Sequence, residues 1–326
     1  MLTSWNIIWG KSLKIVVTGA LGHIGSRLIR ELPVKLPGSR IVMVDNLSTQ
    51  RYCSLFGLVG DSYEFVDADV LEADLPSIFG GVQTIVHLAA LVDPTASFAN
   101  PEQVEHVNYN MTAKVADACL REGCSLFHVS SCSVYGSQSD VFDEDFPVAD
   151  LVPQSPYAAT KLKEEQYLRE LDGLRYSICR FGTICGVSPG MRFQTAVNKF
   201  CWQAAVGEPL TVWQTAMHQK RPYLTLHDAV NAILFFIARD LFDGGVYNVL
   251  SDNLTVSDII GFIARHVPDL DIAYVETAAM NDLSFVVSRQ RVEELGFEFG
   301  GSVENSITET LRLLNSTTES DRPGPR

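Results

Sequence analysis

The 326-residue sequence has little basic charge and no long hydrophobic run. Its 25 lysines and arginines stand against 39 aspartates and glutamates, which gives a formal net charge of −14. Such a surface repels nucleic-acid phosphates and anionic lipid headgroups, and no apolar run is long enough to cross a bilayer. We therefore expect no general nucleic-acid binding and no membrane partner, although a local basic pocket for a small phosphate ligand is compatible with this charge.

The sequence also lacks paired motifs for metal ions or disulfides. Its seven cysteines include no Cys-x-x-Cys, and its seven histidines include no His-x-x-x-His, so we expect no metal. Several cysteines lie inside apolar runs, where cysteine behaves as a small hydrophobic residue. Residues 1–14 lack the basic start, apolar core and cleavage site of a signal peptide. Reduced thiols and a cytoplasmic location are the simplest expectation.

Short apolar runs alternate with helical patterns through the first half of the chain. Nearly continuous, β-branched apolar runs predict strands, and apolar residues at helical spacing between them predict helices. Buried strands separated by helices are typical of a parallel sheet covered on both faces. The predicted strands are 14–18, 41–45, 63–66, 84–88, 126–130 and 176–180, and the predicted helices are 24–32, 104–122 and 157–171.

The sequence indicates two lobes and a tail. We expect a doubly wound α/β domain over residues 1–186 and a smaller lobe over residues 187–314. Residues 227–250, which include a predicted apolar helix and a short predicted strand, are expected to return to the first domain. Residues 315–326 have no apolar periodicity and are predicted to form a flexible tail.

A glycine-rich turn joins the first predicted strand to the first predicted helix. Gly19, Gly22 and Gly25 follow the apolar run KIVVT. At this spacing the first glycine permits a tight turn, the second admits a pyrophosphate to the backbone, and the third lets the helix pack closely on the strand. The N–H groups and dipole of the helix N-terminus then face the anion. We interpret the turn as a dinucleotide-binding site.

Asp45 ends the second predicted strand, 20 residues after Gly25. A carboxylate at this position can accept hydrogen bonds from the adenosine ribose and would repel a 2′-phosphate. The position of Asp45 therefore favours NAD over NADP, although Arg51 nearby leaves room for NADP.

The candidate acid–base pair is Tyr157 with Lys161, four residues later at the start of a predicted helix. Residues at this spacing lie on one helix face, and an ammonium beside a phenol favours the phenolate and lowers its pKa. Tyr157 is thus a candidate general base. Upstream, the run VSSCSVYG ends a predicted strand, and Ser130, Ser131 and Ser133 compete to hydrogen-bond the same substrate oxygen.

Together these motifs resemble the extended short-chain dehydrogenase/reductases, within the nucleotide-sugar epimerase/dehydratase group. The segments that carry the resemblance occur in order over roughly residues 13–260: TGALGHIG, VDN, DADV, HLAA, VSSCSVYG, PYAATK and RFGTICG. The resemblance implies that residues 1–186 form a Rossmann-type domain that binds NAD and that residues 187–314 form a mainly substrate-binding lobe. It also implies a nucleoside-diphosphate sugar as the substrate, and a homodimer.

The resemblance also implies a role for each matching residue. Ser131 matches the catalytic hydroxyl, Tyr157 the base, and Lys161 the lysine that holds the nicotinamide ribose. The implied cofactor-binding residues are Gly19, Gly22, His23, Ile24, Gly25, Asp45, Asn46, Asp69, Val70, Leu88, Ala89, Ala90, Asn108, Tyr157 and Lys161. The implied substrate-binding residues are Ser131, Ser133, Thr183, Arg192, Asn198 and Arg221.

Two differences from members of this group bear on the activity. The 4,6-dehydratases have Asp-Glu after the catalytic hydroxyl residue, whereas Cys132 and Ser133 stand there in this sequence. Gly182 and Thr183 replace the Phe-Asn of UDP-galactose 4-epimerases. The resemblance is therefore closer to the broader set of bacterial nucleotide-sugar epimerases, and 4,6-dehydration is disfavoured.

The resemblance implies an NAD-dependent nucleotide-sugar epimerase, most simply one that inverts C4 through a transient keto-sugar. Hydride passes to the bound NAD and returns on the other face of the sugar. The alternative is an NAD(P)-dependent dehydrogenase or keto-reductase that acts on a nucleotide sugar. A non-catalytic NAD-binding regulator is a third hypothesis, which the presence of the Tyr–Lys pair disfavours.

The proposed role of Asp45 predicts which dinucleotide the protein prefers. NAD is expected to bind more tightly than NADP because the Asp45 carboxylate repels the 2′-phosphate. Calorimetric titration of the cofactor-free protein with each oxidised dinucleotide measures this preference. Clearly tighter binding of NADP would remove Asp45 from the ribose site.

Overall fold

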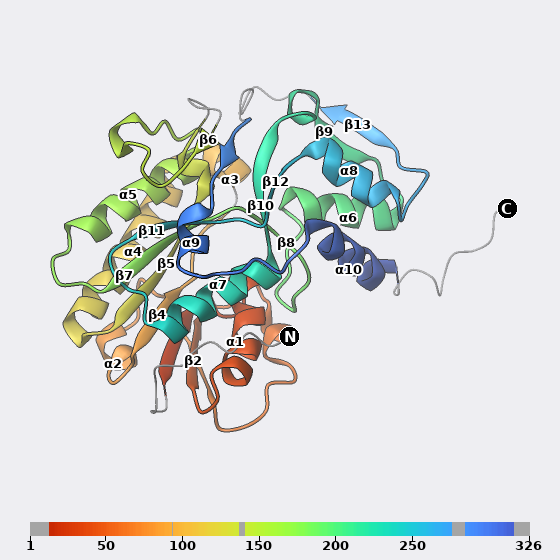
Figure 1. Cartoon of the computed structure of the whole chain (residues 1–326). Coiled ribbons are helices and arrows are strands. Elements are labelled where there is room, and N and C mark those ends of the chain that lie inside the picture. The colour runs from red at the N-terminus through yellow and green to blue at the C-terminus, as the bar shows by residue number, and fades with distance from the viewer. Residues whose placement is uncertain (1–12, 93, 137–140, 276–283, 316–326) are drawn as a thin grey trace.

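The computed structural model describes residues 13–92, 94–136, 141–275 and 284–315, and its centre is a seven-stranded parallel sheet (Figure 1). The strand order is β11-β7-β5-β4-β1-β2-β3. The chain begins in the middle with β1, builds outward through β2 and β3, and continues on the other side of β1 with β4. This is the doubly wound arrangement, so the predicted fold class is confirmed. The strands are β1 (Lys14–Thr18), β2 (Arg40–Asp45), β3 (Tyr63–Asp67), β4 (Thr84–His87), β5 (Ser125–Ser131), β7 (Tyr176–Phe181) and β11 (Val246–Val249).

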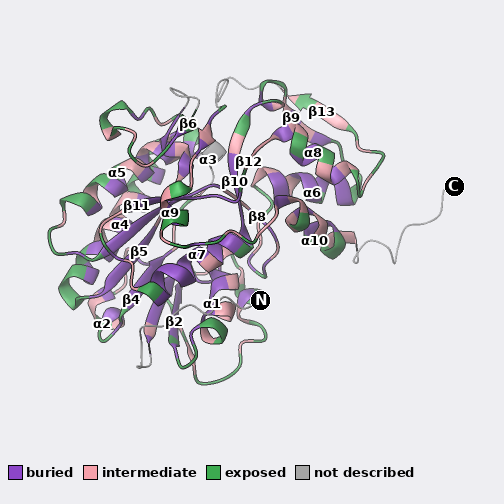
Figure 2. Ribbon diagram, in the orientation of Figure 1, coloured by how far each residue is buried: buried purple, intermediate pink, exposed green. Residues whose placement is uncertain are grey.

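Helices cover both faces of this sheet. The apolar side chains of α1 (His23–Lys35) and α7 (Leu226–Arg239) pack on one face. Those of α2 (Leu75–Phe79), α4 (Pro101–Glu122) and α5 (Pro156–Glu170) pack on the other. Figure 2 shows the strands buried between the two helical layers. Strands buried on both faces need apolar side chains that point both ways, which is why runs such as KIVVT are nearly continuous rather than alternating.

The predicted elements of the first domain are present with small shifts at their ends. The predicted helix 104–122 begins three residues earlier, at Pro101, because proline fits the first turn of a helix. The predicted helix 24–32 continues to Lys35. A short helix that the sequence analysis did not predict, α3 (Pro94–Ala99), precedes α4.

The smaller lobe combines two small sheets with three helices, which share one apolar core. A three-stranded sheet has the order β12-β10-β8, and β13 pairs with β9. The strands are β8 (Thr183–Cys185), β9 (Leu210–Trp213), β10 (Lys220–Thr225), β12 (Asp252–Thr255) and β13 (Ile272–Val275). The helices are α6 (Ala196–Val206), α8 (Val256–Ala264) and α10 (Val303–Asn315).

The start of α8 shows how a local signal fixes a helix end. The sequence offers Thr255 or Ser257 as the N-cap, and the structure uses Thr255. Its hydroxyl accepts a hydrogen bond from the backbone N–H of Asp258 at 3.1 Å, and the Asp258 carboxylate accepts the backbone N–H of Thr255 at 2.9 Å. This reciprocal capping box satisfies two donors that the helix leaves free.

The chain returns from the smaller lobe to the large sheet. β11 forms the sheet edge beside β7, with Val246 opposite Ile178. Asp228, at the start of α7, accepts hydrogen bonds from the backbone N–H groups of Gly300 and Gly301 at 3.0 and 2.8 Å. The segment before α10 is therefore attached to α7. Two short strands, β6 (Val141–Phe142) and β14 (Val286–Val287), pair with each other, and α9 (Gln290–Glu294) packs against β11.

The described residues also bear on the expected ligand classes. No helix in the described ranges is long and apolar enough to span a membrane, and in those ranges no three His, Cys, Asp or Glu side chains gather as a metal site. All seven cysteines are described, and each is a free thiol.

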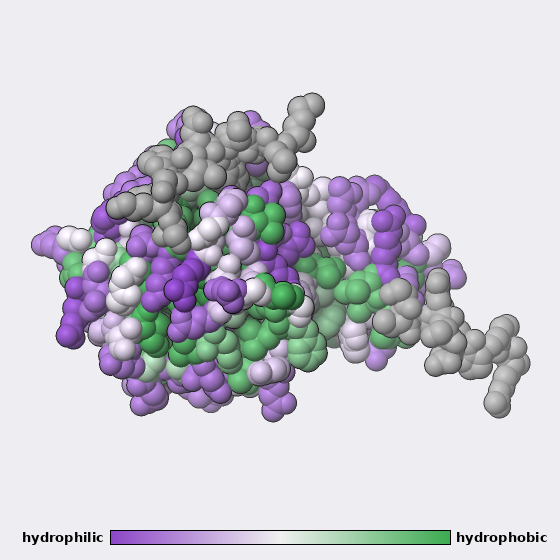
Figure 3. All heavy atoms as spheres, turned by 90° about the horizontal axis from the view of Figure 1, so that it is seen from below, coloured by the Kyte–Doolittle hydropathy of each residue, from purple (hydrophilic) through white to green (hydrophobic). Residues whose placement is uncertain are grey.

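Seen from below, hydrophobic side chains gather in the middle of the surface, with hydrophilic ones around them (Figure 3). The predicted tail at 315–326 lies outside the described residues, apart from residue 315 at the end of α10.

A buried ion pair attaches α5 to the central sheet. Glu165 on α5 accepts two hydrogen bonds from the guanidinium of Arg180 on β7, at 2.9 and 2.6 Å. It accepts a third, at 2.6 Å, from the hydroxyl of Ser130 on β5. Arg180 is only 1% exposed, and its guanidinium lies 4.8 Å from the ring centroid of Tyr135. Charges removed from water persist only when they are paired in this way.

This pairing predicts a large loss of stability when one partner is removed. Arg180→Met is expected to lower the free energy of unfolding by about 3–5 kcal/mol, because Glu165 would remain buried without its hydrogen-bonded counter-charge. The exposed Arg169, 3.6 Å from the Glu165 carboxylate, would be the cation left beside it. The control Arg265→Met removes the exposed ion pair with Glu304 and is expected to cost at most about 1 kcal/mol. Urea denaturation followed by circular dichroism measures both values, and equal losses would contradict the prediction.

Candidate active site

The glycine-rich turn lies at the carboxyl end of β1. Gly19 has a φ of +65°, and a Cβ there would lie 2.6 Å from the backbone nitrogen of Ala89. A Cβ on Gly25 would lie 2.5 Å from the carbonyl oxygen of Gly19, so α1 packs directly on the turn. Gly22 precedes α1 as its N-cap and provides no side-chain hydrogen bond. The first N–H groups of α1 are therefore left without a capping side chain, as an anion site requires.

Residues 186–190, which are distant from the glycine-rich turn in sequence, lie against it. The imidazole of His23 on α1 hydrogen-bonds the carbonyl oxygen of Gly186 through Nε2 at 2.8 Å. The Ser188 hydroxyl donates to the carbonyl oxygen of His23 at 2.8 Å, and the N–H of Gly190 donates to the Ser26 hydroxyl at 2.9 Å. Burial lowers the pKa of His23 to about 4, so the ring is neutral at pH 7. Its backbone, rather than its ring, is left for the predicted cofactor contact.

Acidic and amide side chains gather where β2 and β3 end. Asp45 accepts the backbone N–H of Leu21 in the glycine-rich turn at 3.0 Å. The amide of Asn46 donates to the carboxylate of Asp69 at 2.8 Å. The structure thus brings these three predicted cofactor residues to one edge of the sheet, beside the turn, and Val70 follows them as a buried residue.

The segment after β4 passes over the turn. The Thr18 hydroxyl accepts the N–H groups of Leu88 and Ala89 at 3.2 and 3.3 Å. Asn108, only 1% exposed on α4, bonds both backbone groups of Leu91, at 2.7 and 2.9 Å. The predicted Asn108 therefore holds this segment in place, whereas the predicted residues 88–90 remain partly exposed beside the turn.

Tyr157 and Lys161 lie in the first turns of α5. The Ser155 hydroxyl caps this helix by accepting the N–H of Ala158, and proline occupies its first position. The Lys161 Nζ lies 5.9 Å from the ring centroid of Tyr157. The N-terminal part of α5 faces the residues that follow β5, because α5 packs against the short 3₁₀ helix Cys132–Val134.

The structure separates the three candidate serines. The Ser130 hydroxyl is buried and donates to the carboxylate of Glu165. The hydroxyls of Ser131 and Ser133 lie 2.8 Å apart and remain partly exposed. Ser130 therefore has a structural role, and Ser131 and Ser133 are left as the candidates for a substrate contact.

The surroundings shift the acidity of Tyr157 in the direction opposite to the sequence prediction. Burial raises the pKa of Tyr157, Lys161 lowers it and Glu164 raises it, and the outcome lies above the usual value for a phenol. The prediction of a lowered pKa was wrong because it considered Lys161 without the surrounding protein and without the carboxylate of Glu164.

Two of the predicted substrate residues connect the lobes. Asn198 on α6 is fully buried, accepts the N–H of Gly186 at 3.2 Å and donates to the carbonyl oxygen of Arg192 at 3.0 Å. Arg192 in turn donates to the carbonyl oxygen of Val92, beyond β4, at 3.1 Å. Asn198 thus shapes the segment between β8 and α6, and that segment reaches the first domain.

The other two, Thr183 and Arg221, lie on the neighbouring strands β8 and β10 and are partly exposed. The guanidinium of Arg221 donates to the amide oxygen of Gln219 at 3.2 Å rather than to a carboxylate. Burial lowers the pKa of Arg221. A desolvated guanidinium with a neutral partner is suited to an anionic group such as a diphosphate.

The thiol of Cys132 is buried away from any substrate. The residue is 1% exposed, and its thiol donates to the carbonyl oxygen of Arg180 at 3.2 Å. Burial also raises the pKa of the Cys132 thiol. Its role is packing beneath the serine cluster.

The sequence analysis missed the buried ionisable residues behind the Tyr–Lys pair. Glu164 accepts a hydrogen bond from Lys161 at 2.8 Å, and His128 and His87 lie beyond it. The signal that could have found Glu164 is its spacing, because residues three apart on a helix are neighbours. His128 and His87 come from different strands, so local spacing could not connect them.

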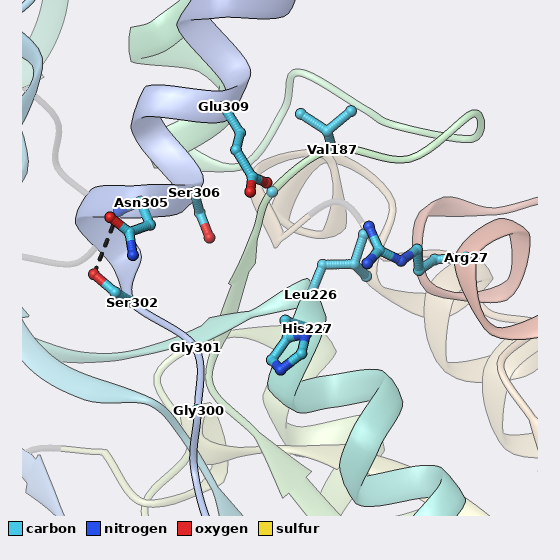
Figure 4. A pocket seen from close by; sticks show the side chains of 11 residues that line it. Arg27, Val187, Leu226, His227, Gly300, Gly301, Ser302, Asn305, Ser306 and Glu309 are labelled. Atoms are coloured by element: carbon cyan, nitrogen blue, oxygen red, sulfur yellow. Dashed lines mark hydrogen bonds between the residues drawn. The ribbon is translucent and has the colours of Figure 1, made fainter. Parts of the chain in front are cut away.

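A cavity of about 200 Å³ lies apart from these residues, between α1, α7, α10 and the segment after β8. Figure 4 shows Arg27 of α1 and Glu309 of α10 on opposite sides of this cavity, with His227 of α7 below them. None of Ser131, Tyr157 and Lys161 lines it, so it is separate from the candidate active site.

A doubly wound sheet with a glycine-rich turn, an acidic strand end and a Tyr–Lys pair at its carboxyl edge defines a dinucleotide-dependent enzyme. The chain belongs to the NAD dependent epimerase/dehydratase family, whose model matches residues 15–249. The resemblance predicted from the sequence is confirmed, and the cofactor is NAD.

Several curated relatives are similar to this chain. UDP-glucose 4-epimerase of Mycolicibacterium smegmatis is 37% identical over 162 residues, which cover 48% of this chain and 50% of that protein. A trifunctional UDP-glucose 4,6-dehydratase/UDP-4-keto-6-deoxy-D-glucose 3,5-epimerase/UDP-4-keto-L-rhamnose-reductase of Arabidopsis thaliana is 27% identical over 327 residues, covering 95% of this chain and 48% of that protein. The chain therefore spans about half the length of this plant relative.

Solved structures show the same fold. The dTDP-glucose 4,6-dehydratase DesIV of Streptomyces venezuelae matches with a TM-score of 0.84 at 24% identity, over 94% of this chain and 98% of that one. UDP-glucuronic acid 4-epimerase of Bacillus cereus matches with a TM-score of 0.82 at 22% identity, over 94% of this chain and 100% of that one. Both an epimerase and a dehydratase share this architecture, so the fold does not separate the two activities.

The residues present fit NAD. A Cβ on Gly22 would meet only the carbonyl oxygen of Gly19 within 4 Å, at 3.2 Å, so the outer side of the turn is open. The uncapped start of α1 would hold the pyrophosphate. Asp45 would accept hydrogen bonds from the adenosine ribose, and Lys161 would hold the nicotinamide ribose. NAD supplies hydride acceptance and return when bound.

The contact between Gly190 and the turn predicts a role that the sequence analysis missed. A Cβ on Gly190 would lie 2.3 Å from the carbonyl oxygen of Leu21 and 2.4 Å from that of Gly22. Gly190→Ala is therefore expected to displace the turn and weaken NAD binding at least about tenfold, or 1.4 kcal/mol. Calorimetry measures the affinity, with Pro189→Ala at the exposed neighbouring position as the control. Unchanged affinity in Gly190→Ala would show that the turn tolerates the displacement.

Proposed function

We propose that the protein is an NAD-dependent nucleotide-sugar epimerase that inverts C4 through a transient keto-sugar. The observation that carries the proposal is the placement of Tyr157 and Lys161 on α5, where the helix packs against the residues that follow Ser131. The partial similarity to UDP-glucose 4-epimerase of Mycolicibacterium smegmatis supports this activity. So does the absence of a carboxylic acid at positions 132 and 133.

Each residue of the site has a chemical task in this reaction. Tyr157 removes the proton from the C4 hydroxyl as the carbon is oxidised, and returns a proton after the keto-sugar has turned over. Ser131, supported by Ser133 at 2.8 Å, hydrogen-bonds the same oxygen as it becomes a carbonyl. Lys161 provides the positive charge that stabilises the Tyr157 phenolate. Bound NAD would supply hydride acceptance and return within the same turnover, so no net NADH is expected.

The second lobe would hold the diphosphate of the sugar nucleotide. Arg221 on β10 has a neutral partner and a lowered pKa, and Arg192 lies on the segment that joins the lobes. Arginine forks match diphosphate geometry. Asn198 supports this site indirectly, because its amide bonds the backbone on both sides of the segment.

Elimination of water, as in a 4,6-dehydratase, would need an acid and a base beyond Tyr157. Cys132 is buried with its thiol bonded to a backbone carbonyl oxygen. Ser133 carries a hydroxyl, whose ordinary acidity is too weak for this role. These two positions favour the epimerase over the dehydratase. The homodimer and the cytoplasmic location stay predictions from the resemblance and from the sequence.

The central test is Tyr157→Phe. This variant is expected to lose about 10²- to 10⁴-fold in epimerisation rate, because the general base is removed, while it still folds and binds NAD. NMR of UDP-, dTDP-, GDP- and CDP-sugars incubated with each protein follows the appearance of the C4 epimer. The control Tyr109→Phe removes a hydroxyl from α4, where the ring packs 5.7 Å from Tyr167, and is expected to keep full activity.

Two results would contradict the proposal. An unchanged rate in Tyr157→Phe would remove the phenol from the reaction. Accumulation of NADH in proportion to converted sugar by the unmodified protein would instead identify a dehydrogenase, which uses the same residues and exchanges its cofactor in every cycle.

A further inference from the structure

We propose that Glu164 is a positioning residue that acts through Lys161: it neutralises the ammonium and so keeps Tyr157 in its protonated form in the resting protein. The inference rests on the proposed role of Tyr157 as the base. It concerns a carboxylate that neither the proposed mechanism nor the resemblance uses.

The first observation is a buried ion pair between two residues of α5, Lys161 and Glu164. The Lys161 Nζ donates to Oε2 of Glu164 at 2.8 Å, and the Thr112 hydroxyl of α4 donates to the same oxygen at 3.0 Å. Glu164 is fully buried and Lys161 is 4% exposed. The pair is therefore shielded from water. In such a low-dielectric environment a counter-charge acts more strongly than it does in water.

The neighbouring carboxylate, Glu165, hydrogen-bonds a different cation. It accepts two hydrogen bonds from the Arg180 guanidinium and one from Ser130, and Arg169 lies 3.6 Å from it. Glu165 also raises the pKa of Lys161, but less than Glu164 does. The hydrogen-bonded cation of Glu165 is therefore on β7, and that of Glu164 is Lys161 on α5 itself.

The histidines that face Glu164 from the sheet are neutral. The Nε2 of His128 on β5 lies 3.3 Å from Oε2 of Glu164 without hydrogen-bond geometry. His87 on β4 stacks on His128 at 6.1 Å, and its Nδ1 lies 2.8 Å from the Thr18 hydroxyl. Burial lowers the pKa of His128 and lowers that of His87 to about 3. Among the described residues, Lys161 is therefore the charged hydrogen-bond partner of Glu164 at neutral pH.

Both members of the pair are charged at neutral pH. Burial raises the pKa of Glu164, but the Lys161 ammonium lowers it, and the pKa lies well below its usual value. Burial lowers the pKa of Lys161, but Glu164 and Tyr157 raise it above its usual value. The ammonium faces Tyr157 as half of a neutral pair, so it favours the phenolate less than an isolated ammonium would. Arg192, from the segment after β8, is the further cation that acts on Tyr157.

This arrangement suits a residue that must both take and return a proton. A lone buried ammonium would stabilise the phenolate so far that Tyr157 would hold its negative charge and return the proton slowly. Partial neutralisation by Glu164 keeps the two protonation states closer in free energy.

The test is a pH titration of the cofactor-free protein, followed by the ultraviolet absorbance of tyrosinate. Subtracting the matching Tyr157→Phe protein isolates the signal of Tyr157. Glu164→Gln is expected to lower the pKa of Tyr157 by at least about one pH unit, because Lys161 loses its counter-charge. Glu164→Asp keeps the charge and is expected to restore titration close to that of the unmodified protein.

The matched control is Glu105→Gln. Glu105 is an exposed carboxylate on α4 that pairs with Lys163, so its removal changes the net charge equally and is expected to leave the titration of Tyr157 unchanged. An unchanged or higher pKa of Tyr157 in Glu164→Gln would overturn the proposal. If Glu164→Gln does not fold, the unmodified protein decides: titration of Tyr157 below the ordinary value of about 10 overturns the proposal, and titration above it supports it.

A second measurement connects the titration to turnover. With an active sugar nucleotide, the acidic limb of the kcat/KM profile is expected to move to lower pH in Glu164→Gln, because a base of lower pKa remains deprotonated at lower pH. A purely structural role would reduce the rate without moving this limb. The titration of Tyr157 needs no sugar nucleotide. If none of the sugar nucleotides were converted, the proposed function would be contradicted, but the titration would still test the role of Glu164.

Discussion

The attachment of α5 to the central sheet depends on two adjacent buried carboxylates. Glu165 bonds Arg180 on β7 and Ser130 on β5, which fixes the helix against the sheet. Glu164 bonds Lys161 on the same helix and Thr112 on α4. Because Tyr157 lies two turns earlier on this helix, its position relative to the glycine-rich turn follows from these bonds. The same short segment therefore contributes both to the stability of the fold and to the electrostatics of the reaction.

The second constraint is the close backbone contact between the two lobes. Gly190 approaches the carbonyl oxygens of the glycine-rich turn so closely that no side chain fits. His23 and Asn198 both hydrogen-bond Gly186, one from the first domain and one from the second lobe. The glycine-rich turn and the second lobe are thus connected through one short segment. Movement of the second lobe would be transmitted to the glycine-rich turn through it.

The sequence predicted features that depend on neighbours in the chain. The strands of the large sheet and the helix that carries Tyr157 follow from local periodicity. Capping chemistry left Thr255 and Ser257 as alternatives for the N-cap of α8, and the structure decided for Thr255. Features that depend on contacts between distant segments were not predicted. Gly190 lies far from the turn in sequence, and α10 buries its apolar face against α6 in the second lobe. The pKa of Tyr157 was predicted in the wrong direction, because burial is a property of the assembled fold.

The last strand of the large sheet is encoded after the first part of the smaller lobe, which comprises β8, α6, β9 and β10. β7 ends at Phe181 and its outer neighbour β11 begins at Val246, so the residues between them are synthesised while one edge of β7 is unpaired. An unpaired, apolar edge strand is a template for association with other chains. A nascent or shortened chain that lacks β11 would present this edge, together with the face that α7 covers, to chaperones or to its own copies. The topology thus makes completion of the large sheet depend on translation of the part of the smaller lobe that lies between β7 and β11.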